Sequence, residues 1–397
     1  MKGYLRADGR KGIRNIVLVT YLVECAHHVA RSIVNNANDN DVQLIGFPGC
    51  YPNEYSLKIM EGLCTHPNVA GVLLVSLGCE GFNREKLAST IEASGRSVDT
   101  LVIQNTGGTK KTIEAGITSV MNLAAQAQLV ERVPMDISEL SVGTICGGSD
   151  GTSGIGANPA VGHCFDRLID QGAVCIFEET GELIGCEQIM AERAITPELG
   201  VEIMKSVEKA EQYYTQMGYG SFAPGNAEGG LTTQEEKSMG AYAKSGSSKI
   251  HGLIKPGDIP RQGGLYLMDV VPDGDPMFGF PNIVDNAEIV EMIASGCHLI
   301  LFTTGRGSVV GSAISPVIKV CANPETYDNL SDDMDINAGK VIKGEATVSQ
   351  VGDEIFELVN KVAQGELSKS EDLGHQEFVL TYKKFEAIGP SCLPTTR

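Results

Sequence analysis

The chain has 397 residues, enough for two or three domains, and its 42% hydrophobic and 20% charged residues are an ordinary globular balance. Its net charge of −19 opposes binding to phosphate backbones and anionic lipids, so neither nucleic acid nor a membrane is an expected partner. No apolar run approaches the ~18 residues that span a bilayer, and the N-terminus lacks the apolar stretch of a signal peptide, so the sequence predicts a cytoplasmic protein.

The first third of the chain alternates short apolar runs with segments of helical periodicity. The predicted strands and helices are, in chain order, Ile16–Thr20, Cys25–Asn35, Val42–Phe47, Tyr55–Cys64, Val69–Leu77, Arg84–Ser94, Thr100–Gln104 and Thr109–Val130. Because these strands lack clean alternation and helices separate them, they indicate a parallel sheet covered on both faces. Val133-Pro134 marks a boundary, which gives predicted domains of residues 1–134 and 135–397.

A second series of strands and helices follows. Its predicted members are the strand Ser141–Ile145, the helix Pro159–Gln171, the strand Ala173–Phe177, the helices Glu182–Ala194, Pro197–Met217 and Thr232–Lys244, the strands Leu265–Val270 and His298–Phe302, and the helix Gly352–Ala363. Thr232 is the expected N-cap of its helix, with Glu235 at the capping-box position. The fold class predicted from both series is α/β, with two Rossmann-like parallel-sheet domains.

Three cysteines follow predicted strands and stand beside glycine. They are Cys50, Cys79 and Cys146, and the carboxyl ends of parallel strands are where ligands bind in such folds. Thiolates favour zinc or iron–sulfur centres, so these cysteines are candidate metal ligands; the alternative is that each is a buried apolar residue at a tight turn. The odd total of 11 cysteines argues against a disulfide framework, and Cys64, Cys164, Cys175 and Cys321 are expected in the core.

Further polar residues stand near predicted strand ends. His27 or His28 is a candidate metal ligand or general base, and Glu178, after the strand Ala173–Phe177, is a candidate metal ligand or base for an α-proton. Lys110 lies in a glycine-rich loop before a long helix, where it could hold a carboxylate. Thr304 and Arg306, in a Thr-Gly-Arg-Gly turn, form the strongest candidate carboxylate site, since guanidinium binds carboxylates bidentately.

Several stretches together resemble the altronate/galactarate dehydratase family. The resemblance covers nearly the whole chain in order and rests on residues 3–15, on Gly78-Cys79-Glu80, on residues 146–160, on Gly229-Gly230-Leu231-Thr232-Thr233 with Glu236-Lys237, and on Phe302-Thr303-Thr304-Gly305-Arg306-Gly307. Asn158, within residues 146–160, and Asn226, just before the Gly229–Thr233 stretch, are expected to bind substrate.

The resemblance implies a hydro-lyase that dehydrates a sugar acid to a 2-keto-3-deoxy acid with ferrous iron, or with an iron–sulfur cluster if thiolates converge. Full-length members carry a small SAF-type domain ahead of this region. The chain is therefore expected to be the large catalytic subunit of an oligomeric enzyme, with the small SAF-domain subunit as a separate chain and a small anionic substrate.

A second branch of the family is similar in architecture but releases sulfite from (2R)-sulfolactate and forms pyruvate. Arg306 and Cys79-Glu80 resemble the dehydratase branch, whereas residues 49–53 and 271–285 depart from it by placing apolar bulk where hydroxyl-binding groups are expected.

The expected reaction is an elimination in which a metal polarises the leaving hydroxyl and a side chain removes the α-proton. Glu178, or His28 of the histidine pair, would be the base and Lys110 an auxiliary donor. A non-catalytic sugar-acid binding subunit is the other alternative. A dinucleotide oxidoreductase is disfavoured, because no G-x-G-x-x-G opens the first helix.

Overall fold

The computed structural model describes residues 1–37, 39–218, 224–274 and 284–383, which fold into two compact units. Unit 1 contains residues 1–3, 133–274 and 284–377, and unit 2 contains residues 4–132 and 378–383, within these described ranges. The predicted boundary at residue 134 stays a prediction. Among the described residues, no helix combines the length and apolar character that a membrane crossing requires.

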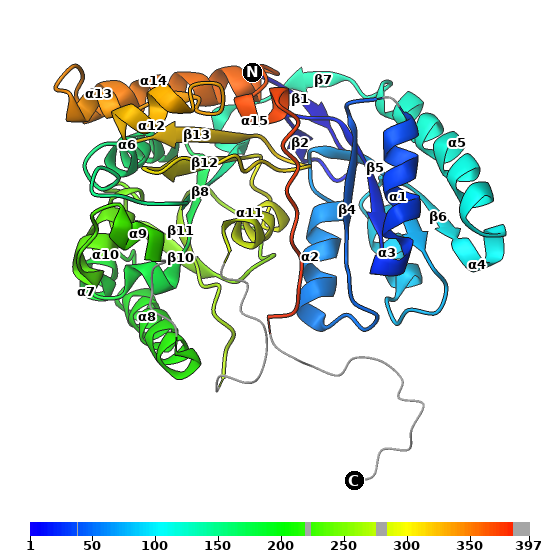
Figure 1. Ribbon diagram of the computed structural model, residues 1–397, viewed down its shortest axis with the longest axis horizontal. Coiled ribbons are helices and arrows are strands. Elements are labelled where there is room, and N and C mark those ends of the chain that lie inside the picture. The colour runs from blue at the N-terminus through cyan, green and yellow to red at the C-terminus, as the bar shows by residue number, and fades with distance from the viewer. Residues whose placement is uncertain (38, 219–223, 275–283, 384–397) are drawn as a thin grey trace, which may run out of the picture. The chain divides into compact units, whose positions relative to one another are not determined.

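Unit 2 is a three-layer α/β arrangement around a parallel four-stranded sheet of order β4-β3-β5-β6 (Figure 1). Its strands are β3 (Ile16–Tyr21), β4 (Val42–Gly46), β5 (Val69–Ser76) and β6 (Ser97–Val102). Helices α1 (Glu24–Ala37) and α5 (Thr109–Ala127) pack on one face, and α2 (Glu54–Cys64) and α3 (Arg84–Ala93) cover the other; the short α4 (Ile103–Thr106) precedes α5. The core between the sheet and α1 and α5 contains Val17, Val19, Ile33, Leu73 and Leu123.

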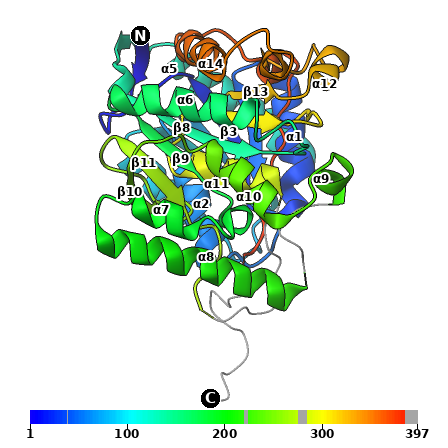
Figure 2. The same ribbon diagram turned by 90° about the vertical axis from the view of Figure 1, so that its left-hand side faces the viewer.

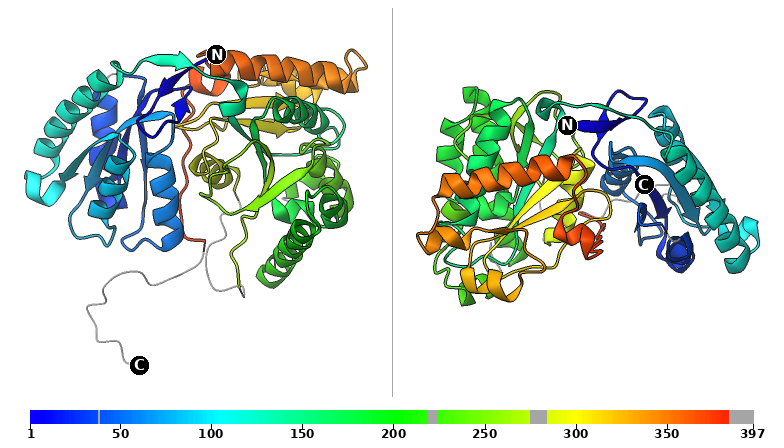
Figure 3. Two further views of the ribbon diagram at one scale, coloured as in Figure 1. Left: turned by 180° about the vertical axis from the view of Figure 1, so that it is seen from behind. Right: turned by 90° about the horizontal axis from the view of Figure 1, so that it is seen from above.

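Unit 1 is built on a parallel seven-stranded sheet of order β10-β11-β9-β8-β12-β13-β14 (Figure 2). The strands are β8 (Ser141–Cys146), β9 (Val174–Phe177), β10 (Ile250–Ile254), β11 (Gly264–Met268), β12 (Leu299–Thr304), β13 (Val317–Cys321) and β14 (Ile336–Asn337). Helix α6 (Ala157–Asp170) packs on one face of the sheet and α11 (Asp285–Ala294) on the other. Helix α14 (Val348–Ala363), orange in Figure 3, packs along α6.

The remaining elements are short or peripheral, apart from one long helix. They are η1 (Ile137–Glu139), η2 (Thr180–Leu183), α7 (Glu187–Glu192), the long α8 (Pro197–Met217), α9 (Pro224–Glu228), α10 (Gln234–Ala243), α12 (Pro324–Asn329), α13 (Gly339–Ile342) and α15 (Lys369–Asp372). A small sheet of order β2-β1-β7 contains β1 (Lys2–Leu5), β2 (Lys11–Gly12) and β7 (Arg132–Pro134).

The α/β fold class with two Rossmann-like parallel sheets is confirmed. Two local predictions are wrong. The single helix expected over Glu182–Ala194 is broken into η2 and α7, because Gly185 takes a left-handed φ of 92° between them. The N-cap of α10 is Thr233, whose side chain accepts from Glu236 N, one residue later than expected.

Candidate active site

The strand order of the seven-stranded sheet reverses between β8 and β12. From β8 the sheet extends through β9 to one edge and through β12 to the other, and open α/β sheets bind ligands beyond the strand ends at such a point. The loop after β8 and the loop after β12 meet there. Gly147 N donates to Thr303 O over 2.9 Å, and Gly305 N donates to Gly148 O over 3.0 Å.

Asp150 fixes the loop after β8. Its carboxylate accepts from Thr152 N and from Asn323 Nδ2, each over 2.8 Å. A Cβ at position 305 would lie 2.2 Å from Asp150 Oδ1, so only glycine at 305 lets the two loops approach this closely. The Asp150 carboxylate therefore has a structural role in holding the two loops together.

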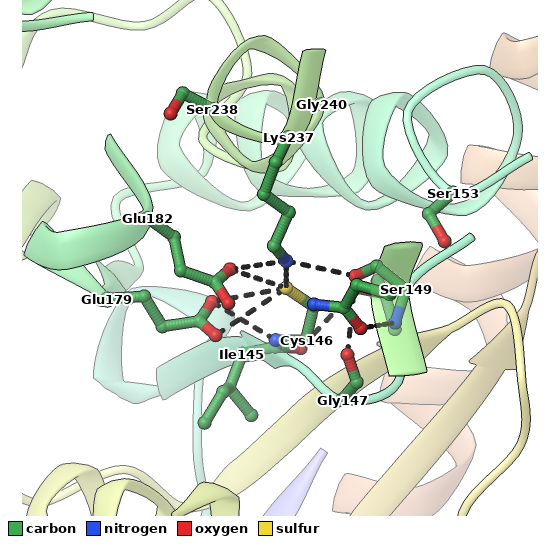
Figure 4. Close-up of polar contacts among 12 residues, drawn as sticks. Ile145, Cys146, Gly147, Ser149, Ser153, Glu179, Glu182, Lys237, Ser238 and Gly240 are labelled. Atoms are coloured by element: carbon green, nitrogen blue, oxygen red, sulfur yellow. Dashed lines mark hydrogen bonds and ion pairs between the residues drawn. The ribbon is translucent and has the colours of Figure 1, made fainter. Parts of the chain in front are cut away.

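Cys146, the last residue of β8, lies at the centre of a buried polar cluster (Figure 4). Its Sγ lies 3.4 Å from Glu179 Oε2 and 3.1 Å from Glu182 Oε2. Lys237 Nζ, from α10, approaches the same sulfur to 3.3 Å. One sulfur therefore contacts two carboxylates and one ammonium group.

Lys237 links this cluster to the loop after β8. Its ammonium donates to Ser149 Oγ over 3.0 Å and lies 2.6 Å from Glu182 Oε2. Burial alone would lower the pKa of Lys237, but the charges of Cys146 and Glu182 raise it above the ordinary lysine value. Lys237 is thus a buried side chain that carries a positive charge at neutral pH.

Glu178 and Glu179, which follow β9, both face the cluster. Neighbouring residues of an extended strand point to opposite faces, but Glu179 has a left-handed φ of 75° that ends this alternation. Glu179 Oε2 forms a fully buried ion pair with Lys244 Nζ, and Cys146 N donates to the same oxygen over 3.2 Å. Carboxylate oxygens of Glu178, Glu179 and Glu288 lie within 4.8 Å of one another.

Two acids of α11 complete the cluster. Burial raises the pKa of Glu288 well above its ordinary value, and the neighbouring Glu178 raises it further. Burial also raises the pKa of Asp285 to about 6, with a further contribution from Glu182. Both acids of α11 therefore hold their protons to a higher pH than ordinary carboxyl groups do.

A cavity of about 390 Å³ adjoins Lys237, between α10 and the segment from Ser149 to Asn158. The volume suits a small ligand. Its lining side chains are Ser149, Asp150, Ser153, Ile155, Asn158, Leu231, Glu236, Lys237, Met239 and Ala241, together with backbone at three glycines. Lys237 thus lies between this cavity and the buried acids.

The predicted substrate-binding residues all belong to unit 1, and only Asn158 lines this cavity. Asn158 Nδ2 donates to Gly240 O over 2.8 Å, and its buried Oδ1 has no hydrogen-bond partner among the described residues. Asn226 Oδ1 accepts from Ser149 N over 3.0 Å and so holds the loop after β8.

Thr304 and Arg306 are engaged by neighbouring backbone. The Thr304 hydroxyl donates to Gly148 O over 3.0 Å, and Arg306 Nη1 donates to Gly225 O over 2.9 Å. Arg306 also lies 3.7 Å from Glu228 and its side chain is 42% exposed. Their substrate-binding roles stay predictions.

The other predicted site residues belong to unit 2. Cys50 and Cys79 are exposed, and their loops are joined by Gly81 N donating to Cys50 O over 2.7 Å. His28 on α1 and Lys110 in the first turn of α5 are both exposed. Since Cys146 lies in unit 1, convergence of the three cysteines on one metal stays a prediction, as do the roles of His28 and Lys110.

Sequence reasoning missed four members of the cluster. No sequence pattern assigns a role to Glu179, Glu182 or Lys244, and Lys237 enters only through the Glu236-Lys237 stretch of the family resemblance. The two lysines carry no local signal, because a lysine on a helix is usually solvated.

Two sets of ligand atoms in the described residues are close enough to hold a metal ion. Cys146, Glu179 and Glu182 form one set, and Glu178, Glu179 and Glu288 form the other. The first set combines a thiolate with two carboxylates, which suits a mononuclear transition metal such as ferrous iron. Most iron–sulfur clusters are held by cysteines alone, whereas the possible ligands beside Cys146 among the described residues are two glutamates.

Comparison with known proteins gives two family matches. Residues 137–385 match the model of the D-galactarate/altronate dehydratase C-terminal domain. Residues 3–128 match the model of the second domain of D-galactarate dehydratase/altronate hydrolase. The buried cluster lies within the first match.

The chain is similar over most of its length to three curated lyases. It is 33% identical to the (2R)-sulfolactate sulfo-lyase subunit beta of Chromohalobacter salexigens, covering 96% of each chain. It is 31% identical to the altronate dehydratase of Bacillus subtilis over 96% of this chain and 77% of the relative. It is 30% identical to the galactarate dehydratase (L-threo-forming) of Escherichia coli over 92% of this chain and 72% of the relative.

Proposed function

Because the chain belongs to the D-galactarate/altronate dehydratase family and is a lyase, we propose that it removes water from a polyhydroxy monocarboxylic acid of the altronate type. The product would be a 2-keto-3-deoxy acid. This choice of substrate is supported mainly by the charged side chains of the cavity beside Lys237, which are one lysine and two acids.

The cavity offers one cation. Lys237 is the basic side chain among its lining residues, whereas Asp150 and Glu236 are acidic and Glu182 lies 2.6 Å from the ammonium. A substrate with one carboxylate can place it near Lys237. Sulfolactate carries a sulfonate and a carboxylate, and galactarate carries two carboxylates, so a second anionic group would lie among acids and be repelled. Hydroxyl groups, by contrast, can donate to those same acids.

Glu178 is the proposed base for the α-proton. Glu179 and Glu182 are each paired with a lysine, which weakens a carboxylate as a base, whereas Glu178 lies beside the acid Glu288 in a buried site. Lys237 would stabilise the negative charge that develops on the substrate carboxylate as the proton leaves. The enol formed by loss of water then tautomerises to the keto acid.

Cys146, Glu179 and Glu182 would hold a ferrous ion, whose Lewis acidity assists departure of the hydroxyl group. Mutation of a residue that merely hydrogen-bonds to a metal ligand typically costs about tenfold or more in metal affinity. Replacing the ligand itself in Cys146→Ser should therefore lower the iron content after dialysis. Cys25→Ser, at an exposed cysteine of unit 2, is the control and should leave iron content unchanged.

The name of the sulfo-lyase relative says that it is one subunit of its enzyme. We propose that this chain likewise works with a small subunit of the SAF type in an oligomeric complex in the cytoplasm. Co-expression with candidate small subunits, followed by light scattering, tests this assembly. A chain that is fully active by itself would contradict it.

The proposed reaction is tested on the complex prepared without oxygen in the presence of ferrous iron. Aldonates, galactarate and sulfolactate are supplied in parallel, and keto acid and sulfite are both measured. Keto-acid formation from aldonates supports the proposal, whereas sulfite release from sulfolactate would assign the chain to the sulfo-lyase branch, which its 33% identity to such a protein favours. Binding of aldonates without turnover would indicate a non-catalytic subunit.

The role of Glu178 has a separate readout. Glu178→Gln should abolish exchange of the substrate α-proton with solvent deuterium while the substrate still binds. Glu192→Gln, at an exposed position of α7, is the matched control and should exchange at the wild-type rate. Wild-type exchange in Glu178→Gln would remove Glu178 as the base.

A further inference from the structure

Cys146 and Lys237 are in direct contact although 91 positions separate them along the chain. Their Sγ and Nζ atoms lie 3.3 Å apart, and each residue is only 2% exposed (Figure 4). Cys146 is a free thiol whose contacts among the described residues are to oxygen and nitrogen. A single oxygen atom bonded to both Sγ and Nζ would join the side chains with little movement.

We propose that dioxygen converts this pair to a reversible N–O–S cross-link between Lys237 Nζ and Cys146 Sγ, which switches the site off. The inhibitory consequence rests on the function proposed above. Formation of the cross-link is independent of the proposed function, because it depends only on the two side chains and the oxidant.

The surroundings of Cys146 disfavour the usual products of thiol oxidation. A disulfide needs a second sulfur in contact, and none of the described cysteines supplies one at Cys146. A sulfinic acid would add an anion 3.1 to 3.4 Å from the carboxylates of Glu182 and Glu179. The cross-link adds no negative charge, so it is the oxidised product that this environment tolerates best.

Lys237 is held in position to react. Ser149 Oγ accepts from Nζ over 3.0 Å, and Glu182 Oε2 lies 2.6 Å from Nζ and 3.1 Å from Sγ. Glu182 can therefore take the proton that the ammonium must lose. The lysine also lines the 390 Å³ cavity, which gives dioxygen a path to the pair.

The reaction balances with one molecule of dioxygen. The thiol, the ammonium and the Glu182 carboxylate give the S–O–NH linkage, one water and a protonated Glu182. The O–O bond of dioxygen, one S–H bond and two N–H bonds break. The S–O and O–N bonds form, together with two O–H bonds in water and one in protonated Glu182. Sulfur and nitrogen each give up two electrons, which reduce one oxygen atom to water and the other to the bridging oxygen.

The cross-link would remove two groups that the proposed reaction uses. The ammonium charge of Lys237 disappears, so the cavity loses its cation, and the Cys146 sulfur can no longer act as a thiolate ligand. Return to the thiol and the amine requires cleavage of both the S–O and the O–N bond, with release of the bridging oxygen as water. The four electrons come from two equivalents of a dithiol such as dithiothreitol, so the inhibition is reversible.

Peptide mass spectrometry of the complex, prepared without oxygen and then exposed to air, tests the proposal. A cross-linked pair of peptides containing Cys146 and Lys237 is expected, heavier by one oxygen and lighter by two hydrogens. It should disappear on treatment with dithiothreitol. Activity towards aldonates should fall in proportion to the cross-linked fraction and recover with the reductant.

Two lysines provide controls. Lys237→Arg keeps the positive charge but lacks a primary amine, so no cross-linked peptide pair should form at Cys146 after exposure to air. Lys244 is equally buried but pairs with Glu179, and it should appear in no cross-link. Air-exposed wild-type protein with an unmodified Cys146, or with sulfinic acid there, would overturn the inference. A cross-link in a complex that turns over no aldonate would leave it standing and refute only the proposed reaction.

Discussion

Replacing the buried Lys244 should strongly destabilise unit 1, because it leaves the buried Glu179 carboxylate without its ion-pair partner. Its ammonium is fully buried at the end of α10 and pairs with Glu179, whose side chain is 5% exposed. In Lys244→Met the methionine fills most of the same volume, but among the described residues the Glu179 carboxylate then has Cys146 N and the Cys146 thiol as its remaining donors. Breaking a buried pair in this way costs about 3–5 kcal/mol.

The double variant Lys244→Met, Glu179→Gln distinguishes the energetic cost of the unpaired charge from the cost of altered packing. With both charges removed, the cost should fall below about 2 kcal/mol, because a neutral amide can still accept from Cys146 N. Lys249→Met, at an exposed lysine a few residues later, is the control and should change stability by no more than about 0.5 kcal/mol.

The assay is urea unfolding followed by circular dichroism. With a slope of roughly 3 kcal/mol per molar urea, the single variant should lower the transition midpoint of unit 1 by roughly 1 to 2 M. The double variant should recover more than half of that loss. Equal destabilisation of the single and double variants would refute the reasoning, since it would place the cost in packing rather than in the uncompensated charge.

Three further predictions follow from other contacts. Gly305→Ala should destabilise unit 1 by about 1–3 kcal/mol, because its Cβ would lie 2.2 Å from Asp150 Oδ1; an unchanged urea midpoint would show that the two loops can separate freely. Burial alone would raise the pKa of Asp8, but hydrogen bonds from Arg10 and Arg96 lower it from 3.8 to about 2. The resulting stabilisation of unit 2 is complete above about pH 4, is lost as the pH falls towards 2, and amounts to about 1 kcal/mol for a group this accessible to solvent. Asp8→Asn should therefore flatten the stability profile between those pH values in acid titrations, and an unchanged profile would contradict the assignment. Arg306→Ala should alter stability by less than about 1 kcal/mol, since its side chain is 42% exposed. If Arg306 binds the substrate carboxylate as the sequence predicts, KM should rise at least tenfold in Arg306→Ala with a smaller change in kcat. An unchanged KM would leave Arg306 with the structural role of holding α9 through its hydrogen bond to Gly225 O.

The fold was predictable because its signals are local. Apolar runs such as 69–76 are too continuous for a half-exposed sheet, and the helices between them show regular apolar faces, which together specify parallel sheets. Cys146 and Glu178, both at predicted strand ends, belong to two neighbouring sets of possible ligands that share Glu179. Two missed elements have weaker signals. Strand β10 is five residues long with one buried position, and α11 is buried on most sides although Glu288 and Glu291 interrupt its apolar residues.

The contacts of the site were not predictable because they join residues far apart in sequence. Lys237 reaches Cys146 across 91 positions, and Lys244 reaches Glu179 across 65. Nothing local in α10 distinguishes a lysine that enters a buried cluster from one that remains solvated, since both fit a helix equally well. Only the packing of α10 over η2 decides which lysines are buried.

Glu179 shows why the sequence pattern does not reveal all the acidic groups of the site. Period-two alternation places Glu178 and Glu179 on opposite faces, so sequence reasoning could assign at most one of them to the site. The left-handed φ of 75° at Glu179 overrides this, at a cost of roughly 1–2 kcal/mol for a residue other than glycine or asparagine. The buried pair with Lys244 is the contact that can offset this cost, because it forms only when Glu179 faces inward. Lys244 therefore does more than neutralise a charge: it holds the backbone conformation that brings the oxygens of two consecutive glutamates to one centre.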